Sequence, residues 1–278
     1  MNARLLFILL LFTIGALWYI IGYWRRKAGE AAFAAARLTE KNEERERYCR
    51  LAVMAGHREA CRMFCLLHPE RFDGHSPHKP FKLRGIRISF YGYYYPSRYN
   101  ALLNDEQRAF CHSIYQFKQG DIHGIEFFKT CMNALQLKKR PYHIMFMPCS
   151  NWIKYGQRFK RLDWYIGKHR QDLTSGLYDV DICDARESLH EAKGGEKRIL
   201  ERNYLITGKI KGKEIIIIDD VLTTGQSVVD YKEEIERCGG KVVAAIFYGK
   251  TLSMPSMLLV QIHVWGNHIA HIIERMTK

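Results

Sequence analysis

The clearest hydrophobic pattern in the chain is a run of four isoleucines at residues 215–218. Four consecutive β-branched residues with no polar alternation are typical of a parallel strand that is buried on both faces. Two carboxylates follow at Asp219 and Asp220, then a short Thr/Gly segment, and a helical pattern begins near Ser227. The pattern therefore predicts a strand, a turn and a helix, in that order.

Other segments repeat the alternation of strands and helices. Strands are predicted near residues 86–95, 141–147 and 242–248. Helical periodicity covers residues 104–136, with an interruption near Gly120, and residues 228–238, which Gly239 and Gly240 close. A further helix is predicted from Asn267. Strands that alternate with helices indicate an α/β domain.

The N-terminal pattern is different, because residues 5–24 contain no charged side chain. Twenty helical residues span roughly 30 Å, the thickness of the hydrocarbon core of a bilayer. Aromatic residues gather toward one end of the run, and three cations follow it at residues 25–27. The pattern predicts a single transmembrane helix in a bacterial inner membrane, with the C-terminal part in the cytoplasm. A cleaved signal peptide is the alternative, although the basic cluster follows the apolar run rather than preceding it.

Between the apolar run and the α/β domain, residues 28–72 indicate a helical stalk that ends in a helical hairpin. One helical face of this hairpin carries His57, Cys61, Cys65 and His68. A zinc site is one interpretation, but a single straight helix rarely supplies more than two ligands to one ion, so buried thiols and structural histidines are the other. The predicted organisation is an anchor with its basic flank at residues 1–27, the stalk at 28–72, a linker at 73–83 and the α/β domain at 84–278.

Charge and cysteine content narrow the possible partners. The chain has 43 Lys and Arg against 29 Asp and Glu, a formal net charge of +14, and residues 25–99 hold 16 basic and 8 acidic side chains. This balance suits phosphorylated ligands, nucleic acid or an anionic lipid surface. The eight cysteines are scattered without the spacing of a disulfide framework, as is typical of a reducing compartment.

The strand–turn–helix segment also carries the candidate chemistry. Open α/β sheets bind their ligands at the carboxyl ends of the strands, where Asp219 and Asp220 are expected. The first N–H groups of a helix and its dipole favour a phosphate, and Gly225 allows a close backbone approach. A ribose 5-phosphate satisfies both features, with its hydroxyls on the carboxylates and its phosphate on the loop.

Residues 215–227 closely resemble the phosphoribosyl pyrophosphate (PRPP) signature of type I phosphoribosyltransferases. The resemblance implies a twisted, mainly parallel sheet flanked by helices, and a reaction that requires Mg²⁺. It implies that Asp219 and Asp220 hold the ribose hydroxyls and contact the metal indirectly. The implied PRPP-binding loop is Val221, Leu222, Thr223, Thr224, Gly225, Gln226 and Ser227. The implied pyrophosphate loop is Cys149, Ser150 and Asn151, with Lys154 and Arg158 behind it.

Within that family, four segments before the signature resemble the competence-protein-F (ComF) branch. They are residues 114–120, 146–150, 156–159 and 201–203. Residues 156–159 reorder the Arg-Gly-Phe of that branch, and no cysteine pairs of a zinc ribbon precede the domain. The resemblance also implies that residues 171–208 cover the active site.

Two functions follow from these features. The first is a membrane-anchored, Mg²⁺-dependent enzyme that transfers the phosphoribosyl group of PRPP to a base or an amine. The second is a non-catalytic effector module that senses nucleotides or nucleic acid, as in DNA uptake or in antiphage defence beside retrons. In the second case, the basic residues of 25–99 would contact anionic lipid or nucleic acid. The sequence leaves the acceptor and any homo-oligomer undefined.

Overall fold

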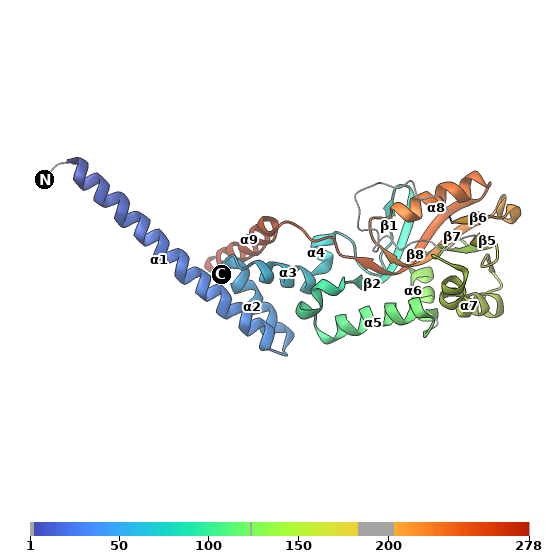
Figure 1. Ribbon diagram of the computed structural model, residues 1–278, viewed down its shortest axis with the longest axis horizontal. Coiled ribbons are helices and arrows are strands. Elements are labelled where there is room, and N and C mark those ends of the chain that lie inside the picture. Colours follow the sequence, from blue (N-terminus) through green and yellow to red (C-terminus); the bar gives the residue numbers. More distant parts are fainter. Residues whose placement is uncertain (1–2, 123, 183–202, 278) are drawn as a thin grey trace. The chain divides into compact units, whose positions relative to one another are not determined.

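The computed structural model describes residues 3–122, 124–182 and 203–277. Its chain forms two compact units (Figure 1). The first unit comprises Met1–Gly74, Ala101–Leu103 and Ser253–Lys278, and the second comprises His75–Asn100 and Asn104–Leu252. The C-terminal segment of the chain thus belongs to the same unit as the N-terminal helices.

The first unit is helical. It contains α1 (Ala3–Leu38), α2 (Asn42–Met54), α3 (Arg58–Leu67), α4 (Pro69–Asp73) and α9 (Met257–Met276). Helices α1 and α2 approach closely at Gly29, where an added Cβ would lie 3.0 Å from the Cβ of Ala55. Within this unit, α2 and α3 pack on each other, α1 packs on α2, and α9 packs on both α2 and α3.

The residue set on α3 has structural partners. The side chain of His57 caps α3 by accepting a hydrogen bond from the N–H of Ala60, and Cys61 and Cys65 are buried. Burial raises the pKa of the Cys65 thiol to about 12, so this thiol is protonated at neutral pH. Within the described residues, no three His, Cys, Asp or Glu side chains form a group that could hold a metal ion.

The predicted transmembrane anchor over residues 5–24 is wrong. Among the helices that the structure describes, none is both long enough and apolar enough to cross a membrane. The apolar run is not a separate segment, because α1 continues through Arg25, Arg26 and Lys27 to Leu38 as one helix. The predicted single-pass location in an inner membrane, and the transmembrane helix in the predicted fold class, are contradicted by the same finding.

The second unit is built on a six-stranded sheet in the order β1-β2-β8-β7-β3-β4. Every neighbouring pair is parallel except β1 and β2, so the predicted mainly parallel α/β sheet is present. A second sheet pairs β5 with β6 in antiparallel fashion. The strands are β1 (Phe81–Leu83), β2 (Ile86–Tyr94), β3 (Tyr142–Phe146), β4 (Leu173–Ser175), β5 (Val180–Ile182), β6 (Tyr204–Ile206), β7 (Glu214–Leu222) and β8 (Lys241–Thr251).

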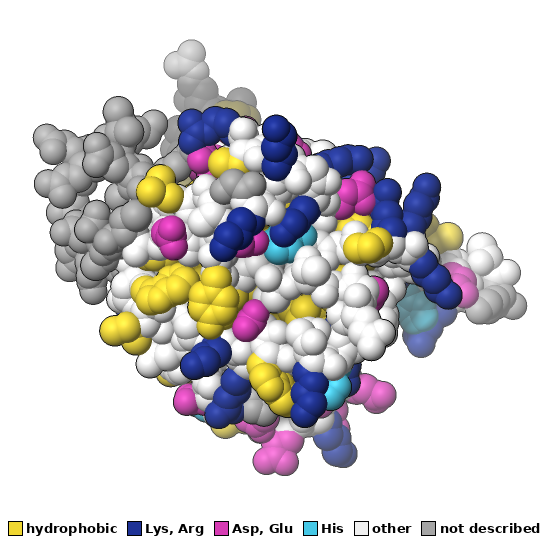
Figure 2. Space-filling model, turned by 90° about the vertical axis from the view of Figure 1, so that its right-hand side faces the viewer, with side chains coloured by type: hydrophobic (Ala, Val, Ile, Leu, Met, Phe, Trp, Pro, Cys, Tyr) yellow, Lys and Arg dark blue, Asp and Glu magenta, His cyan; other side chains and the backbone are white. Residues whose placement is uncertain are grey.

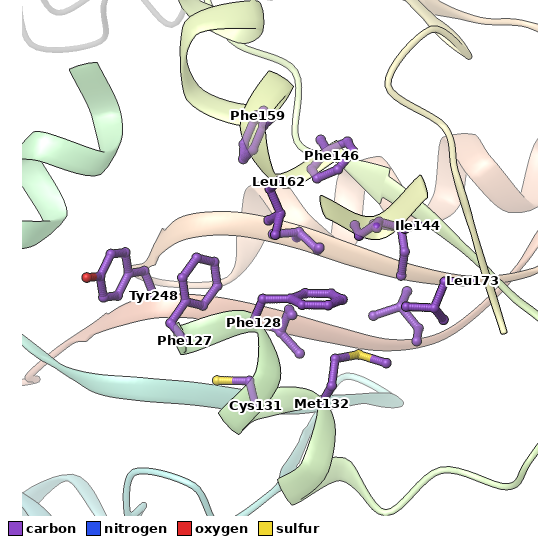
Figure 3. Close-up of a cluster of buried hydrophobic side chains, with 14 of the residues drawn as sticks. Phe127, Phe128, Cys131, Met132, Ile144, Phe146, Phe159, Leu162, Leu173 and Tyr248 are labelled. Carbon is purple, nitrogen blue, oxygen red and sulfur yellow. The ribbon is translucent and has the colours of Figure 1, made fainter. Parts of the chain in front are cut away.

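Helices cover both faces of the main sheet. One face carries α5 (Asp105–Gln119), α6 (Ile125–Leu135) and α7 (Trp152–His169), and the other carries α8 (Gln226–Arg237) (Figure 1). Alternate residues of β7 serve the two layers: Ile216 and Ile218 join the core beneath α5–α7, while Ile215 lies near Ile235 of α8. Figure 3 shows the larger core, where aromatic side chains of α6 and α7 meet β3 and β8. Two-sided coverage explains why residues 215–218 lack polar alternation.

Local signals define several helix ends. Asn104 and Gln107 form a capping box at the start of α5, and Gly120 ends it with a φ of 81°. The interruption predicted near Gly120 is confirmed, because α6 begins at Ile125. The prediction that the last helix begins at Asn267 is wrong: α9 begins at Met257, where Ser256 caps it.

Two short 3₁₀ segments, Ser97–Leu102 and Gly208–Ile210, complete the described elements. Residues 183–202, most of the segment expected to cover the active site, lie outside the described residues. On the face shown in Figure 2, Lys and Arg side chains lie among Asp and Glu side chains rather than forming one continuous positive patch. The net charge of +14 therefore does not by itself identify a binding surface.

Candidate functional site

Strands β3 and β7 form the topological switch point of the sheet, and we refer to the residues around it as the crevice. These two strands are neighbours, but the chain leaves β3 through α7 toward β4 and leaves β7 through α8 toward β8. The two connections therefore depart in opposite directions. In open α/β sheets, the loops at such a switch point separate and leave a binding crevice at the carboxyl ends of the strands.

Asp219 and Asp220 lie at this crevice. The last β7 residue that pairs with β3 is Ile218, opposite Phe146, whereas β7 continues to pair with β8 from Asp219 to Leu222. The two carboxylates thus stand at the point where β3 ends beside them. Each carboxylate accepts a hydrogen bond from the next backbone N–H: Asp219 from Asp220 at 2.7 Å, and Asp220 from Val221 at 2.6 Å.

Two cations from the helices beneath the sheet contact this acid pair. Nη1 of Arg158, on α7, lies 2.9 Å from Oδ2 of Asp220 and 3.8 Å from Oδ1 of Asp219. Nζ of Lys118, at the end of α5, lies 3.3 Å from the same Oδ2 of Asp220. All but Lys118 are largely buried, since side-chain exposures are 16% for Arg158 and Asp219 and 10% for Asp220. The crevice therefore places two cations beside two largely buried carboxyl groups.

Burial dominates the electrostatics of the acid pair. It raises the pKa of Asp219 well above its usual range, and the neighbouring charge of Asp220 raises it further. The charges of Arg158 and Lys118 act in the opposite direction. Burial thus disfavours the charged form of Asp219, whereas Asp220 makes the shorter ion pairs with Arg158 and Lys118.

The segment after β7 has the geometry of an anion site. Helix α8 begins at Gln226, and Gly225 precedes it with a φ of 78° and no side-chain cap. Helix N-terminal N–H groups without a cap attract phosphate, and the helix dipole favours negative charge there. Thr223 and Thr224 are exposed beside this helix start, although the Thr224 hydroxyl lies 3.4 Å from the N–H of Gln226. Val221 and Leu222 belong to β7 itself.

The turn between β1 and β2 reaches this segment. A Cβ on Gly225 would lie 2.2 Å from Cδ2 of Leu83, so the loop and β1 are in close contact. Nη1 of Arg84 donates a hydrogen bond of 2.5 Å to Oε1 of Gln226, whose amide group contacts Asp230. Arg84 has a φ of 45°, which is uncommon for a residue other than glycine. The turn therefore holds an exposed cation at the start of α8.

The loop after β3 is held by two asparagines. The amide of Asn203 donates to the carbonyl oxygens of Cys149 at 3.2 Å and Ser150 at 3.4 Å. Oδ1 of Asn151 accepts a hydrogen bond from the N–H of Lys154 and so caps α7. Burial raises the pKa of the Cys149 thiol to about 12, which keeps it neutral. The Lys154 side chain is exposed on α7.

The site thus combines residues from five separate parts of the chain: Arg84, Lys118, residues 149–158, Asn203 and residues 219–227. Of the predicted residues, Arg158 and the acid pair are in direct contact. Lys118 and Arg84 were not assigned to this site from the sequence. A signal existed for Lys118, because it belongs to residues 114–120, which carry part of the family resemblance. Arg84 lies in a turn with no motif, and only its contact with Gln226 identifies it.

Hard metal ions prefer oxygen ligands, and Mg²⁺ is commonly held by one or two carboxylates together with substrate phosphates. Asp219 and Asp220 provide such carboxylates. Asp220 already contacts two cations, and no further carboxylate or histidine forms a metal-binding group with this pair within the described residues. The donor set therefore fits an ion that arrives with a diphosphate better than an ion that the protein holds alone.

Comparisons with known proteins find similarity in the part of the chain that contains β7. Residues 171–251 match the model of the phosphoribosyl transferase domain. A segment of 57 residues is 42% identical to an orotate phosphoribosyltransferase of Sulfolobus acidocaldarius, and the match covers 20% of this chain and 26% of that relative. The chain thus spans about a quarter of the length of the curated relative that it matches. The matched residues 171–251 include β7, its acid pair and α8.

Proposed function

We propose that this protein binds PRPP in the crevice between β3 and β7 and transfers its phosphoribosyl group to a nitrogen of a base or an amine. The observation that carries the proposal is the position of Asp219 and Asp220 at a topological switch point, directly before an uncapped helix start. The hydroxyls of a ribose 5-phosphate need hydrogen-bond acceptors such as these carboxylates, and its phosphate needs N–H donors such as those of the helix start. The family match over residues 171–251 supports the same ligand class.

We assign the ribose hydroxyls to Asp219 and Asp220, and the 5-phosphate to the backbone N–H groups and hydroxyls of residues 223–227. Hydroxyls donate hydrogen bonds to carboxylates. Burial disfavours the charged form of Asp219 and raises its pKa, and hydroxyl donors would stabilise that charged form. Arg84 would add a positive charge beside the 5-phosphate, since its guanidinium already reaches Gln226. Asn203 would position the loop of residues 149–151 for the pyrophosphate.

In the transfer, the bond between C1 of the ribose and the pyrophosphate oxygen breaks while a bond to the acceptor nitrogen forms. Negative charge develops on the leaving pyrophosphate, so nearby cations lower the barrier. Arg158 and Lys118 are the cations closest to the acid pair, and we assign to them the stabilisation of that charge. Mg²⁺ would neutralise the pyrophosphate when it is bound, with Asp219 and Asp220 nearby.

Orotate is the first acceptor to test, because the partial relative is an orotate phosphoribosyltransferase. The ComF-like segments offer the finer family assignment, and they give no acceptor. Several residues with assigned roles lie before the matched residues 171–251: Arg84, Lys118, Cys149, Ser150, Asn151 and Arg158. Their roles therefore depend on the geometry of the crevice.

The test is calorimetric titration of the full chain with PRPP and Mg²⁺, with release of pyrophosphate followed after orotate, purine or pyrimidine bases and amines are added. The variant Asp219→Asn/Asp220→Asn should weaken PRPP binding at least about tenfold, since it removes charged hydrogen-bond acceptors. The matched control Asp121→Asn/Asp163→Asn removes two carboxylates outside the crevice and should bind as the wild type does.

Equal binding by the wild type and by the Asp219→Asn/Asp220→Asn variant would contradict the proposed ribose site. Release of pyrophosphate that depends on an added acceptor would establish the transferase. Tight binding of PRPP without release, across all acceptors, would instead favour the non-catalytic effector module.

A further inference from the structure

A second candidate binding site lies away from the crevice, at the amino ends of β2 and β3. Two cavities, of about 600 and about 630 Å³, open there on the side of the sheet that carries α6. Gln136, the residue after α6, lines both of them. Because Tyr142 begins β3 and Cys149 follows its end, the length of this strand, roughly 15 Å, separates the second cavity from the crevice.

The walls of the two cavities are strongly basic. The first is lined by Lys79, Lys82 and Arg87, and no carboxylate lines it. The second is lined by Lys138, Lys139, Arg140 and Arg170, with Asp172 as its acidic residue. Arg140 and Arg170 form ion pairs, Arg140 with Glu214 at 2.6 Å and Arg170 with Asp172 at 2.8 Å.

Five cations therefore face the two cavities without an ion pair to any described carboxylate: Lys79, Lys82, Arg87, Lys138 and Lys139. The carboxyl end of α6 accounts for only part of this set. A helix dipole favours cations just after its last turn, where Lys138 and Lys139 lie. Lys79, Lys82 and Arg87 belong to β1, its approach and β2. Like charges gathered without carboxylates repel one another, unless an anionic ligand offsets them.

The distribution of the cations favours an extended polyanion. A single phosphate or mononucleotide would occupy one cavity and leave the cations of the other without a partner. A nucleic acid strand carries one phosphate per nucleotide and engages both cavities at once. Phe81, which is half-buried, lines the first cavity beside these cations, and aromatic rings beside cations are typical of surfaces that bind single strands.

We propose that these two cavities form a binding site for single-stranded nucleic acid. The site uses none of the residues assigned to PRPP. The proposed nucleic acid site can therefore be tested independently of the proposed transferase activity. Recognition rests on the phosphate backbone, so the affinity depends steeply on salt and little on base sequence.

The test is fluorescence anisotropy of a labelled oligothymidylate of about 20 nucleotides with the full chain, over a series of potassium chloride concentrations. The variant Lys79→Gln/Lys82→Gln/Lys138→Gln/Lys139→Gln should bind at least about tenfold more weakly at low salt. Its slope of log affinity against log salt should fall by about 3, since each phosphate contact on a single strand contributes about 0.7.

The control variant Lys129→Gln/Lys160→Gln/Lys168→Gln/Lys232→Gln loses the same four charges outside both cavities, and it should keep the wild-type affinity and slope. Replacement of the four cavity lysines by arginine should also keep binding, which separates charge from folding defects. Asp219→Asn/Asp220→Asn should bind the oligonucleotide as the wild type does.

Three results would overturn the proposal: no oligonucleotide binding by the wild type, an equal loss in both glutamine variants, or binding of thymidine monophosphate or inorganic phosphate as tight as that of the oligonucleotide. The last result would leave a phosphate site rather than a site for a strand.

Discussion

At the scale of single residues, the crevice depends on how charge is balanced around Asp219 and Asp220. Arg158 contacts both carboxylates, and Lys118 contacts only Asp220. Asp219 is thus the less neutralised of the two, and burial raises its pKa. A ribose hydroxyl that donates to Asp219 would stabilise its charged form, which burial disfavours.

This imbalance predicts a pH-dependent stability. The pKa of Asp219 in the folded chain is raised above 3.8, its ordinary value in the unfolded chain. At a pH between the unfolded-state pKa and the folded-state pKa, the folded state holds a proton that the unfolded state has released. The free energy of unfolding therefore falls as the pH rises through that window. Asp219→Asn removes this loss, and its melting temperature should exceed that of the wild type by about 2–4 °C at neutral to mildly alkaline pH.

Thermal unfolding followed by circular dichroism from acidic to mildly alkaline pH checks this prediction. The difference between Asp219→Asn and the wild type should be near zero where Asp219 is protonated in both states, and should grow as the pH rises. Asp163→Asn, a change on α7 outside the crevice, provides the reference. A difference that shrinks with rising pH would contradict a raised pKa.

At the scale of elements, the phosphate segment is built by β7, α8 and the turn between β1 and β2. Gly225 permits this arrangement for two reasons: its φ is 78°, and Leu83 occupies the space of a Cβ. Arg84, next to Leu83, then reaches Gln226. The element that contributes this cation is 142 residues away in the sequence.

The contact predicts the effect of Gly225→Ala. The positive φ and the clash with Leu83 should together destabilise the chain by about 1–3 kcal/mol and weaken PRPP binding, because the segment must shift. The double variant Leu83→Ala/Gly225→Ala removes the clash but not the backbone strain, so PRPP binding should recover in part. Chemical denaturation and calorimetry measure both effects, and no difference between the single and double variants would contradict the contact.

At the scale of the whole molecule, the second unit is organised by a core that joins its sheet to α5, α6 and α7. The rings of Phe146 on β3 and Phe159 on α7 are stacked with centroids 4.8 Å apart (Figure 3). Phe159 is followed along α7 by Leu162 in the same core, and it lies next to Arg158. The core therefore fixes the helix that presents the cation to the acid pair.

Truncation of this core should affect stability and site together. Phe146→Ala should lower the free energy of unfolding by about 3–5 kcal/mol, since the ring is fully buried. Tyr115→Ala, at a side chain on α5 that is 59% exposed, should change it by less than about 0.5 kcal/mol. Urea unfolding measures both, and similar values for the two variants would contradict the assigned core.

The sequence by itself determined the local parts of this protein. The run of isoleucines, the adjacent carboxylates and Gly225 predicted a buried strand, an acid pair and a helix start, and β7 and α8 have this order. Such features depend on neighbouring residues, whose backbone preferences act over a few positions. Periodicity likewise predicted the break at Gly120.

Only the tertiary structure decided which distant residues meet. The contacts of Lys118 and Arg158 with the acid pair depend on how α5 and α7 pack beneath the sheet, and the contact of Arg84 with Gln226 depends on strand order. Hydrophobic periodicity shows which face of an element is buried, but not which neighbour covers it. Hydropathy over residues 5–24 led to the prediction of an anchor, which is contradicted because no described helix is both long enough and apolar enough to cross a membrane.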